Sequence, residues 1–171
     1  QTPEKRMLGV NRRREGQVLK RAGLGMGPKV WLQSPEWLIV EWLGGESVDE
    51  TAFASLTANG ELAELTARLH NRGLSGYRLD LQQQFTRYWQ QIDRRRITPA
   101  WLRWQRYFIT GTMPRPLQLA TLHMDIHAGN LLRQAGQLRL IDWEYAADGD
   151  IALELAAMFR FNQFSPAVQQ R

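Results

Sequence analysis

The chain has 171 residues, of which 43% are hydrophobic and seven are tryptophan, so it can bury the core of one domain. It has no cysteine, which excludes disulfides and thiolate metal sites, and no stretch of the roughly 18 consecutive apolar residues that span a membrane. Since no apolar leader is present either, we expect a cytoplasmic protein without membrane contact.

The formal charge of +5 raises the question of nucleic-acid binding. The candidate patches are two arginine triplets, at residues 12–14 and 94–96. Neither triplet is interleaved with aromatic residues, and the chain has no helix-turn-helix signature and no zinc-finger spacing. We therefore interpret both triplets as solvated helix faces and expect no nucleic-acid partner.

The first third of the chain predicts one helix followed by two strands. The helical pattern covers residues 11–21 and ends before the glycines and the proline of residues 23–28. Apolar and aromatic residues then predict strands at residues 29–33 and 37–42, joined by a Ser-Pro turn. A pair of glycines at residues 44–45 marks a hinge into a mainly helical remainder.

The remainder predicts four helices and one hairpin. Apolar residues recur at helical spacing in four segments, namely residues 59–70, 81–92, 98–108 and 150–160. Two short apolar runs, residues 131–133 and 138–141, flank the sequence Gln-Ala-Gly-Gln, whose glycine is typical of a turn. We therefore expect a β-hairpin before the last helix.

Three side chains that carry oxygen acceptors lie around this hairpin. Asn130 stands at the start of its first strand and Asp142 at the end of its second, so both lie at one rim, and Asp125 lies in the loop leading into that rim. Magnesium-assisted transfer of a phosphoryl group to an alcohol uses one carboxylate to deprotonate the hydroxyl. An amide oxygen and a second carboxylate hold the metal ions. Asp125, Asn130 and Asp142 fit these three roles.

Two other interpretations of this segment remain open. The first is an ordinary polar loop followed by an ordinary hairpin. The second is a hydrolytic metal site, because His123, Asp125 and His127 alternate and an extended segment would point all three to one side. Such a centre usually needs further ligands, and His70 is the only other histidine.

A family resemblance rests on three motifs, which are His123-x-Asp125-x4-Asn130, Ile141-Asp142-Trp143-Glu144 and Gly149-Asp150-x3-Glu154-Leu155-Ala156. In this order they resemble the aminoglycoside phosphotransferase and choline kinase family, which comprises small-molecule relatives of protein kinases. The resemblance implies an α+β, protein-kinase-like fold, mainly the helical C-terminal lobe with a truncated N-terminal lobe. Residues 1–43 would be the remnant of the N-terminal lobe with the inter-lobe hinge. Residues 44–171 would be the helical lobe with the catalytic loop and the metal-binding hairpin, truncated at its C-terminus.

The resemblance also implies the roles of the motif residues, with ATP as the phosphoryl donor and Mg²⁺ as the metal. Asp125 would be the catalytic base, Asn130 a ligand of one Mg²⁺, and Asp142 the carboxylate that bridges metal and phosphates. His123 would orient the catalytic loop through backbone contacts. Asp150 and Glu154 would support the loop, although the family usually has an aspartate where this chain has the longer Glu154.

Further roles implied by the resemblance concern the nucleotide. The main chain of Glu41, Trp42 and Leu43 would bind the adenine edge. Glu15 lies where the family has a helix glutamate that pairs with a phosphate-binding lysine. This chain has neither that lysine nor a glycine-rich phosphate loop, so we expect a fragment of a larger protein.

The segments 122–131 and 138–157 most resemble the members of the family that phosphorylate thiamine. A fixed positive charge on the substrate would suit aromatic faces and carboxylates near the catalytic loop, and Trp143, Glu144 and Asp148 are the candidates. Phosphorylation of choline or of an aminoglycoside remains an alternative. So does a non-catalytic module that binds a nucleotide or another ligand.

Overall fold

The computed structural model describes residues 9–170, which form two compact units. The described part of unit 1 comprises residues 9–10 and 79–115, and that of unit 2 comprises residues 11–78 and 116–170. This division does not coincide with the lobe boundary that we expected between residues 43 and 44, which stays a prediction.

Unit 1 is a helical hairpin. It contains α5 (Leu81–Gln91), the short 3-10 helix η1 (Arg94–Arg96) and α6 (Pro99–Thr110). The rings of Phe85 and Phe108 pack with their centroids 5.3 Å apart, which joins α5 to α6. Both helices were predicted from their apolar spacing, and both are confirmed within two residues of the expected bounds.

Unit 2 begins with α2 (Arg12–Ala22), which is followed by β1 (Val30–Gln33) and β2 (Leu38–Val40). Asn11 caps α2, because its side chain accepts a hydrogen bond from the main-chain N–H of Arg14 at 3.0 Å. The two strands pair in antiparallel fashion. The helix and both strands predicted for this segment are confirmed.

Two consecutive helices follow, α3 (Glu50–Asn59) and α4 (Glu61–His70). Gly60 separates them with a φ of 90°, a left-handed conformation that glycine adopts without steric cost. The helix expected at residues 59–70 is therefore α4, whereas α3 was not predicted. Only Phe53 and Leu56 of α3 are buried, so its apolar pattern is weak.

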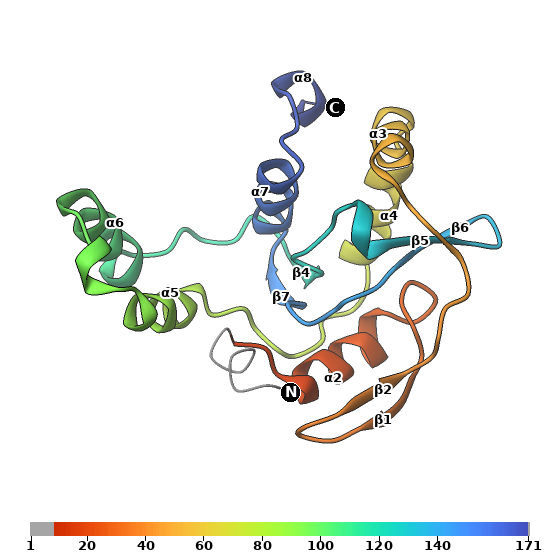
Figure 1. Ribbon diagram of the computed structural model, residues 1–171, viewed down its shortest axis with the longest axis horizontal. Helices are drawn as coiled ribbons and strands as arrows, with labels where there is room; N and C mark the ends of the chain where they lie inside the picture. The colour runs from red at the N-terminus through yellow and green to blue at the C-terminus, as the bar shows by residue number, and fades with distance from the viewer. Residues whose placement is uncertain (1–8, 171) are drawn as a thin grey trace. The chain divides into compact units, whose positions relative to one another are not determined.

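Besides the pair β1–β2, the strands of unit 2 form two small antiparallel sheets (Figure 1). In one, β3 (Glu46–Ser47) pairs with β5 (Leu131–Gln134), which pairs with β6 (Gln137–Leu140). In the other, β4 (Leu119–Leu122) pairs with β7 (Ala147–Asp150). The hairpin β5–β6 was predicted, but β3, β4 and β7 were not.

Helix α7 (Ile151–Phe161) starts directly after β7, and α8 (Pro166–Gln169) is the last element. The prediction of a helix at residues 150–160 is confirmed. The core of unit 2 is built from α2, α3, α4, α7 and the hairpin, with side chains such as Leu65, Leu131 and Leu140 fully buried. Within residues 9–170, no helix combines the length and the apolar character needed to cross a membrane.

Candidate active site

The β5–β6 hairpin brings Asn130 and Asp142 to the same rim. Leu131 pairs with Leu140, and the main-chain N–H of Ile141 donates to the carbonyl of Asn130 at 3.0 Å. Asn130 is buried in the short 3-10 helix η2 (Ala128–Asn130), whereas Asp142 is exposed and has a φ of 58°. This left-handed backbone turns the chain sharply after β6, so the Asp142 carboxylate stands at the end of the strand.

Asn130 also holds Asp125. Its Nδ2 donates both to the main-chain carbonyl and to Oδ2 of Asp125, each at 2.9 Å. The side chain of Asp125 is 27% exposed, so the carboxylate is anchored yet open to solvent. The three residues that the sequence assigned to phosphoryl transfer are therefore brought together at one rim.

The donor set at this rim suits Mg²⁺. Because Nδ2 of Asn130 makes both hydrogen bonds, its Oδ1 is left as an acceptor, and Asp142 adds a carboxylate at the same rim. Mg²⁺ is typically held by one or two protein oxygens plus phosphates and water. Among residues 9–170, no group of three or more histidine, aspartate or glutamate side chains could hold a metal by itself.

The alternative of a hydrolytic metal centre is wrong for this segment. His123 points into the core, where its Nε2 lies 3.0 Å from the carbonyl of Ile141. His127 turns toward Phe161, with the two ring centroids 4.8 Å apart, and its Nδ1 accepts from the N–H of Gly129. Nε2 of His127 lies 3.8 Å from Oδ2 of Asp125, but His123 is bonded to Ile141 in the core, so the three side chains do not gather around one point.

His123 is a buried, neutral histidine. Burial lowers its pKa below the ordinary value, although Glu154 and the carbonyl of Ile141 act in the opposite direction. The Nε2–H is the donor to Ile141, which leaves Nδ1 unprotonated and without a hydrogen-bond partner in the described chain. The ring also packs edge-on against Trp143, with the centroids 5.0 Å apart. His123 thus links the loop of Asp125 to the loop of Asp142.

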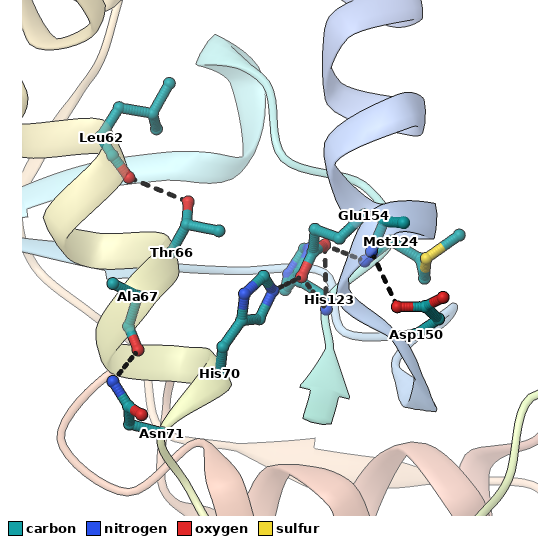
Figure 2. A network of polar contacts seen from close by, with 10 residues as sticks. Leu62, Thr66, Ala67, His70, Asn71, His123, Met124, Asp150 and Glu154 are labelled. Carbon is teal, nitrogen blue, oxygen red and sulfur yellow. Dashed lines mark hydrogen bonds and ion pairs between the residues drawn. The ribbon is translucent and has the colours of Figure 1, made fainter. Parts of the chain in front are cut away.

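Glu154 holds the main chain of the loop that carries Asp125. Figure 2 shows its carboxylate between His70, on α4, and the main chain of His123 and Met124. It accepts from the N–H of His123 at 3.1 Å and from that of Met124 at 2.6 Å, and lies 3.1 Å from Nε2 of His70. Met124 has a φ of 67°, so these bonds hold a backbone conformation that is unfavourable for a non-glycine residue. The extra methylene of glutamate does not prevent the contact with the loop.

Asp150 has a different supporting role. Its carboxylate caps α7 by accepting from the N–H of Ala152 at 3.2 Å, and it also accepts from the N–H of Leu117 at 3.1 Å. It therefore fixes the start of the helix that carries Glu154. The third sequence motif predicted Asp150 as a supporting residue. In the structure its contact is the N-terminal cap of α7.

The three residues predicted to contact the substrate are all buried, and the structure gives them internal contacts. Trp143 is 1% exposed, and its Nε1 donates to the carbonyl of Leu140 at 2.9 Å. Asp148 accepts from the main chain and hydroxyl of Ser75, from the N–H of Gly76 and from the hydroxyl of Thr121, at 2.7 to 2.9 Å.

Glu144 forms an ion pair, with its Oε2 3.6 Å from Nη2 of Arg12. Proximity in sequence to Asp142 had suggested that Trp143, Glu144 and Asp148 face the substrate. The substrate prediction is corrected for Trp143 and Asp148, whose polar atoms are engaged inside the protein, and Glu144 is tied to helix α2.

A cavity of about 260 Å³ does lie beside Asp125. Its lining comes from the catalytic loop and from one face of α7, with Met124, Asp125, Ile126, Glu154, Ala157, Met158, Arg160 and Phe161. Apart from Glu154, which the third motif had indicated, the sequence did not indicate the α7 members. Their spacing of three and four residues along a helix that follows the motif is the signal that could have found them.

Glu15 lies on the inner face of α2 and is 7% exposed. Its partner is Arg12, one helical turn earlier, which forms an ion pair with it. Burial raises the pKa of Glu15, Arg12 acts to lower it, and the charges of Asp142 and Glu144 raise it further. Glu15 thus lies close to the Asp142 loop, and an arginine takes the place of the expected lysine as its partner among the described residues.

The predicted hinge residues lie just after β2. The N–H of Glu41 donates to the carbonyl of Lys29 at 2.7 Å, whereas the main chain of Leu43 makes no hydrogen bond within the described chain. Trp42 is 88% exposed. Glu41 and Leu43 also line a cavity of about 470 Å³, together with Gly27, Lys29 and others. Free main-chain groups at Leu43 are what recognition of a base edge requires.

The model of the phosphotransferase enzyme family matches residues 4–171 of this sequence. The chain belongs to the phosphotransferase enzyme family. Its sequence is 43% identical to a thiamine kinase of Escherichia coli O157:H7 over 146 residues, which are 85% of this chain and 52% of that protein. The chain therefore spans about half the length of the thiamine kinases that it matches.

Solved structures of a choline kinase have the same fold. Choline kinase LicA from Streptococcus pneumoniae superposes with a TM-score of 0.74 at 20% identity, covering 99% of this chain and 63% of that one. LicA in complex with AMP gives a TM-score of 0.72 at 20% identity, over 94% of this chain and 58% of that one. The α+β, kinase-like fold expected from the sequence is confirmed.

Proposed function

We propose that this chain carries the catalytic loop and metal-binding hairpin of an ATP-dependent enzyme that phosphorylates the hydroxyethyl group of thiamine. The observation that carries the proposal is the Asn130 amide, which holds the Asp125 carboxylate at 2.9 Å while its own oxygen is left toward the rim that bears Asp142. This arrangement separates a proton acceptor from two metal-binding oxygens, as phosphoryl transfer to an alcohol requires.

Asp125 acts as the general base. Its carboxylate accepts the proton of the substrate hydroxyl as the oxygen attacks the γ-phosphorus of ATP. Asn130 fixes Oδ2 of Asp125, so the other carboxylate oxygen, Oδ1, is directed to the substrate. Glu154 holds the N–H groups of the two preceding residues, and this keeps the loop from drifting away from the rim.

Asn130 Oδ1 and the Asp142 carboxylate are the groups that hold Mg²⁺. When bound, the metal neutralises charge on the nucleotide phosphates. Asp142 has a φ of 58°, a left-handed conformation that turns the chain just after β6. The main chain at Leu43 is proposed to bind the adenine edge of the nucleotide, and a structural neighbour has been solved in complex with AMP.

The assignment of thiamine rests on the thiamine kinase that is 43% identical to this chain over 146 aligned residues. The cavity beside Asp125 is lined by two carboxylates, those of Asp125 and Glu154, and by the ring of Phe161, which suit a cationic alcohol, and by one cation, Arg160. We propose this cavity as the substrate site, in place of the sequence-based choice of Trp143, Glu144 and Asp148.

The test is Mg²⁺-dependent release of ADP, with thiamine, choline and kanamycin offered separately. We expect release with thiamine, and we expect Asp125→Asn to lower the turnover by a factor of about 10² to 10⁴, as for loss of a general base. Asp49→Asn is the matched control, because Asp49 caps the exposed start of α3 and asparagine caps equally well.

Release with choline or kanamycin alone would keep the reaction type and discard thiamine. If no alcohol supports release although Mg²⁺-ADP binds, the chain is a nucleotide-binding module. Equal turnover of the Asp125→Asn variant and the control would refute the role of Asp125.

A further inference from the structure

Arg12 lies in the first turn of α2 and contacts two carboxylates that are far apart in sequence. Its Nη1 pairs with Oε2 of Glu15 on the same helix, and its Nη2 lies 3.6 Å from Oε2 of Glu144. The Arg12 side chain is 20% exposed, whereas the side chains of Glu15 and Glu144 are 9% and 8% exposed. The guanidinium therefore occupies a largely desolvated position between two buried acids.

A second contact joins Glu144 to α2. Nη2 of Arg14 donates to the main-chain carbonyl of Glu144 at 3.2 Å. Both the side chain and the backbone of Glu144 are thus attached to the first turn of the helix. Since Glu144 comes two residues after Asp142, the helix and the proposed metal ligand are mechanically connected through a very short stretch of chain.

The intervening residue, Trp143, limits the movement of that stretch. It is 1% exposed, its Nε1 is bonded to the carbonyl of Leu140, and its own carbonyl accepts from the N–H of Ala146 at 3.0 Å. Asp142 is therefore held on one side by the hairpin and on the other by a turn whose Glu144 is attached to α2.

The negative charges of Glu15 and Glu144 explain why an arginine suits position 12. Two buried carboxylates repel each other, and neither is stable in a desolvated site without a cation. One planar guanidinium can serve both acids through different nitrogen atoms, which the single nitrogen of a lysine does less well. Without Arg12, Glu15 and Glu144 would move apart or take up water, and the turn that carries Asp142 would shift with Glu144.

The geometry points to Arg12 as a positioning residue that fixes the Asp142 loop against helix α2. It contacts neither substrate nor metal and acts through Glu144. The effect on Mg²⁺-nucleotide binding rests on the proposed function, whereas the restraint on the loop does not.

The experiment compares Arg12→Met with Arg13→Met. Arg13 is the next residue on α2 and is exposed, so the same substitution there removes a charge without removing this contact. The first readout is hydrogen exchange of the Ala146 amide, which is bonded to Trp143, with the Leu140 amide as reference because it is bonded to Met26 at 2.7 Å. The second readout is calorimetric affinity for Mg²⁺-ADP.

We expect Arg12→Met to speed exchange at Ala146 about tenfold and to weaken Mg²⁺-ADP binding about tenfold, with Leu140 unchanged. Arg13→Met should do neither. In a cycle with Glu144→Gln, the double variant should be no worse than Arg12→Met alone, because Arg12→Met already removes the ion pair with Glu144. The conservative Arg12→Lys should recover part of both effects.

The inference is overturned if exchange at Ala146 is the same in both methionine variants. It is also overturned if exchange rises but the affinity for Mg²⁺-ADP is unchanged, since Arg12 would then be a purely structural contact. Failure of the unaltered chain to bind Mg²⁺-ADP would count against the proposed function, and the exchange data would still decide whether Arg12 restrains the Asp142 loop.

Discussion

Substitution of Glu154 by alanine should destabilise unit 2 severely, because its carboxylate is the shared acceptor for the catalytic loop. It is 1% exposed and accepts from the N–H groups of His123 and Met124 at distances between 2.6 and 3.1 Å. Hydrogen bonds to a charged group contribute about 1.5–3 kcal/mol each, so the two sum to about 3–6 kcal/mol. Water that enters the space left by the side chain offsets part of this, and we expect a loss of about 3–5 kcal/mol.

Such a loss is a large share of the about 5–15 kcal/mol that stabilises a typical domain. It is measurable by urea unfolding followed by far-ultraviolet circular dichroism. At a slope of about 2 kcal/mol per molar urea, a loss of about 4 kcal/mol lowers the midpoint by about 2 M. Glu154→Gln keeps the shape and one acceptor oxygen, so it should cost about 1–2 kcal/mol.

The matched control is Glu46→Ala, which removes an exposed carboxylate from β3 and should change stability by no more than about 0.5 kcal/mol. A midpoint for Glu154→Ala close to that of the control would refute the reasoning. It would mean that solvent or another group satisfies the loop N–H groups as well as Glu154 does.

The remaining predictions concern the metal ligand, a buried histidine and a buried acid. Asp142→Asn should weaken Mg²⁺-ADP binding at least about tenfold in calorimetry, since it removes a negatively charged metal ligand, and an unchanged affinity would exclude that role. Burial holds the pKa of His123 below its ordinary value of 6.5, so the unfolded chain binds a proton first as the pH falls. Stability should therefore drop as the pH falls below about 6.5, and His123→Gln should flatten this drop in thermal melts measured across pH 5 to 7. An equal slope in both proteins would contradict the assignment. Asp148→Ala leaves the donors of Ser75, Gly76 and Thr121 unpaired and should cost about 3 kcal/mol or more in urea unfolding, without altering KM for thiamine in the variant that remains folded.

Part of the secondary structure near the site could be predicted from local patterns. The hairpin of β5 and β6 followed from two apolar runs around a glycine turn, and α7 followed from its apolar spacing. Each of these two patterns is carried by residues that are close to one another in sequence. The placement of Asn130 and Asp142 at one rim then followed from the antiparallel geometry of the hairpin alone.

The pairing of β4 with β7 could not be predicted in this way. β7 has the sequence Ala-Asp-Gly-Asp, which has no β-branched or aromatic residue, and its strand conformation depends on hydrogen bonds with a segment about 28 residues earlier. The acid of that strand, Asp148, looked like a surface group suited to a cation. In the folded chain Asp148 is buried and accepts a hydrogen bond from Ser75, which is 73 residues away in sequence.

By itself, the sequence determined which residue types could perform phosphoryl transfer and the order in which they follow one another. Asp125, Asn130 and Asp142 lie within one local unit, where short-range geometry controls distances. Only the tertiary structure decided which acids are internal and which face the site, because burial depends on contacts between distant segments. Glu144 against Arg12 and Glu154 against His70 are such contacts, and no local pattern encodes them.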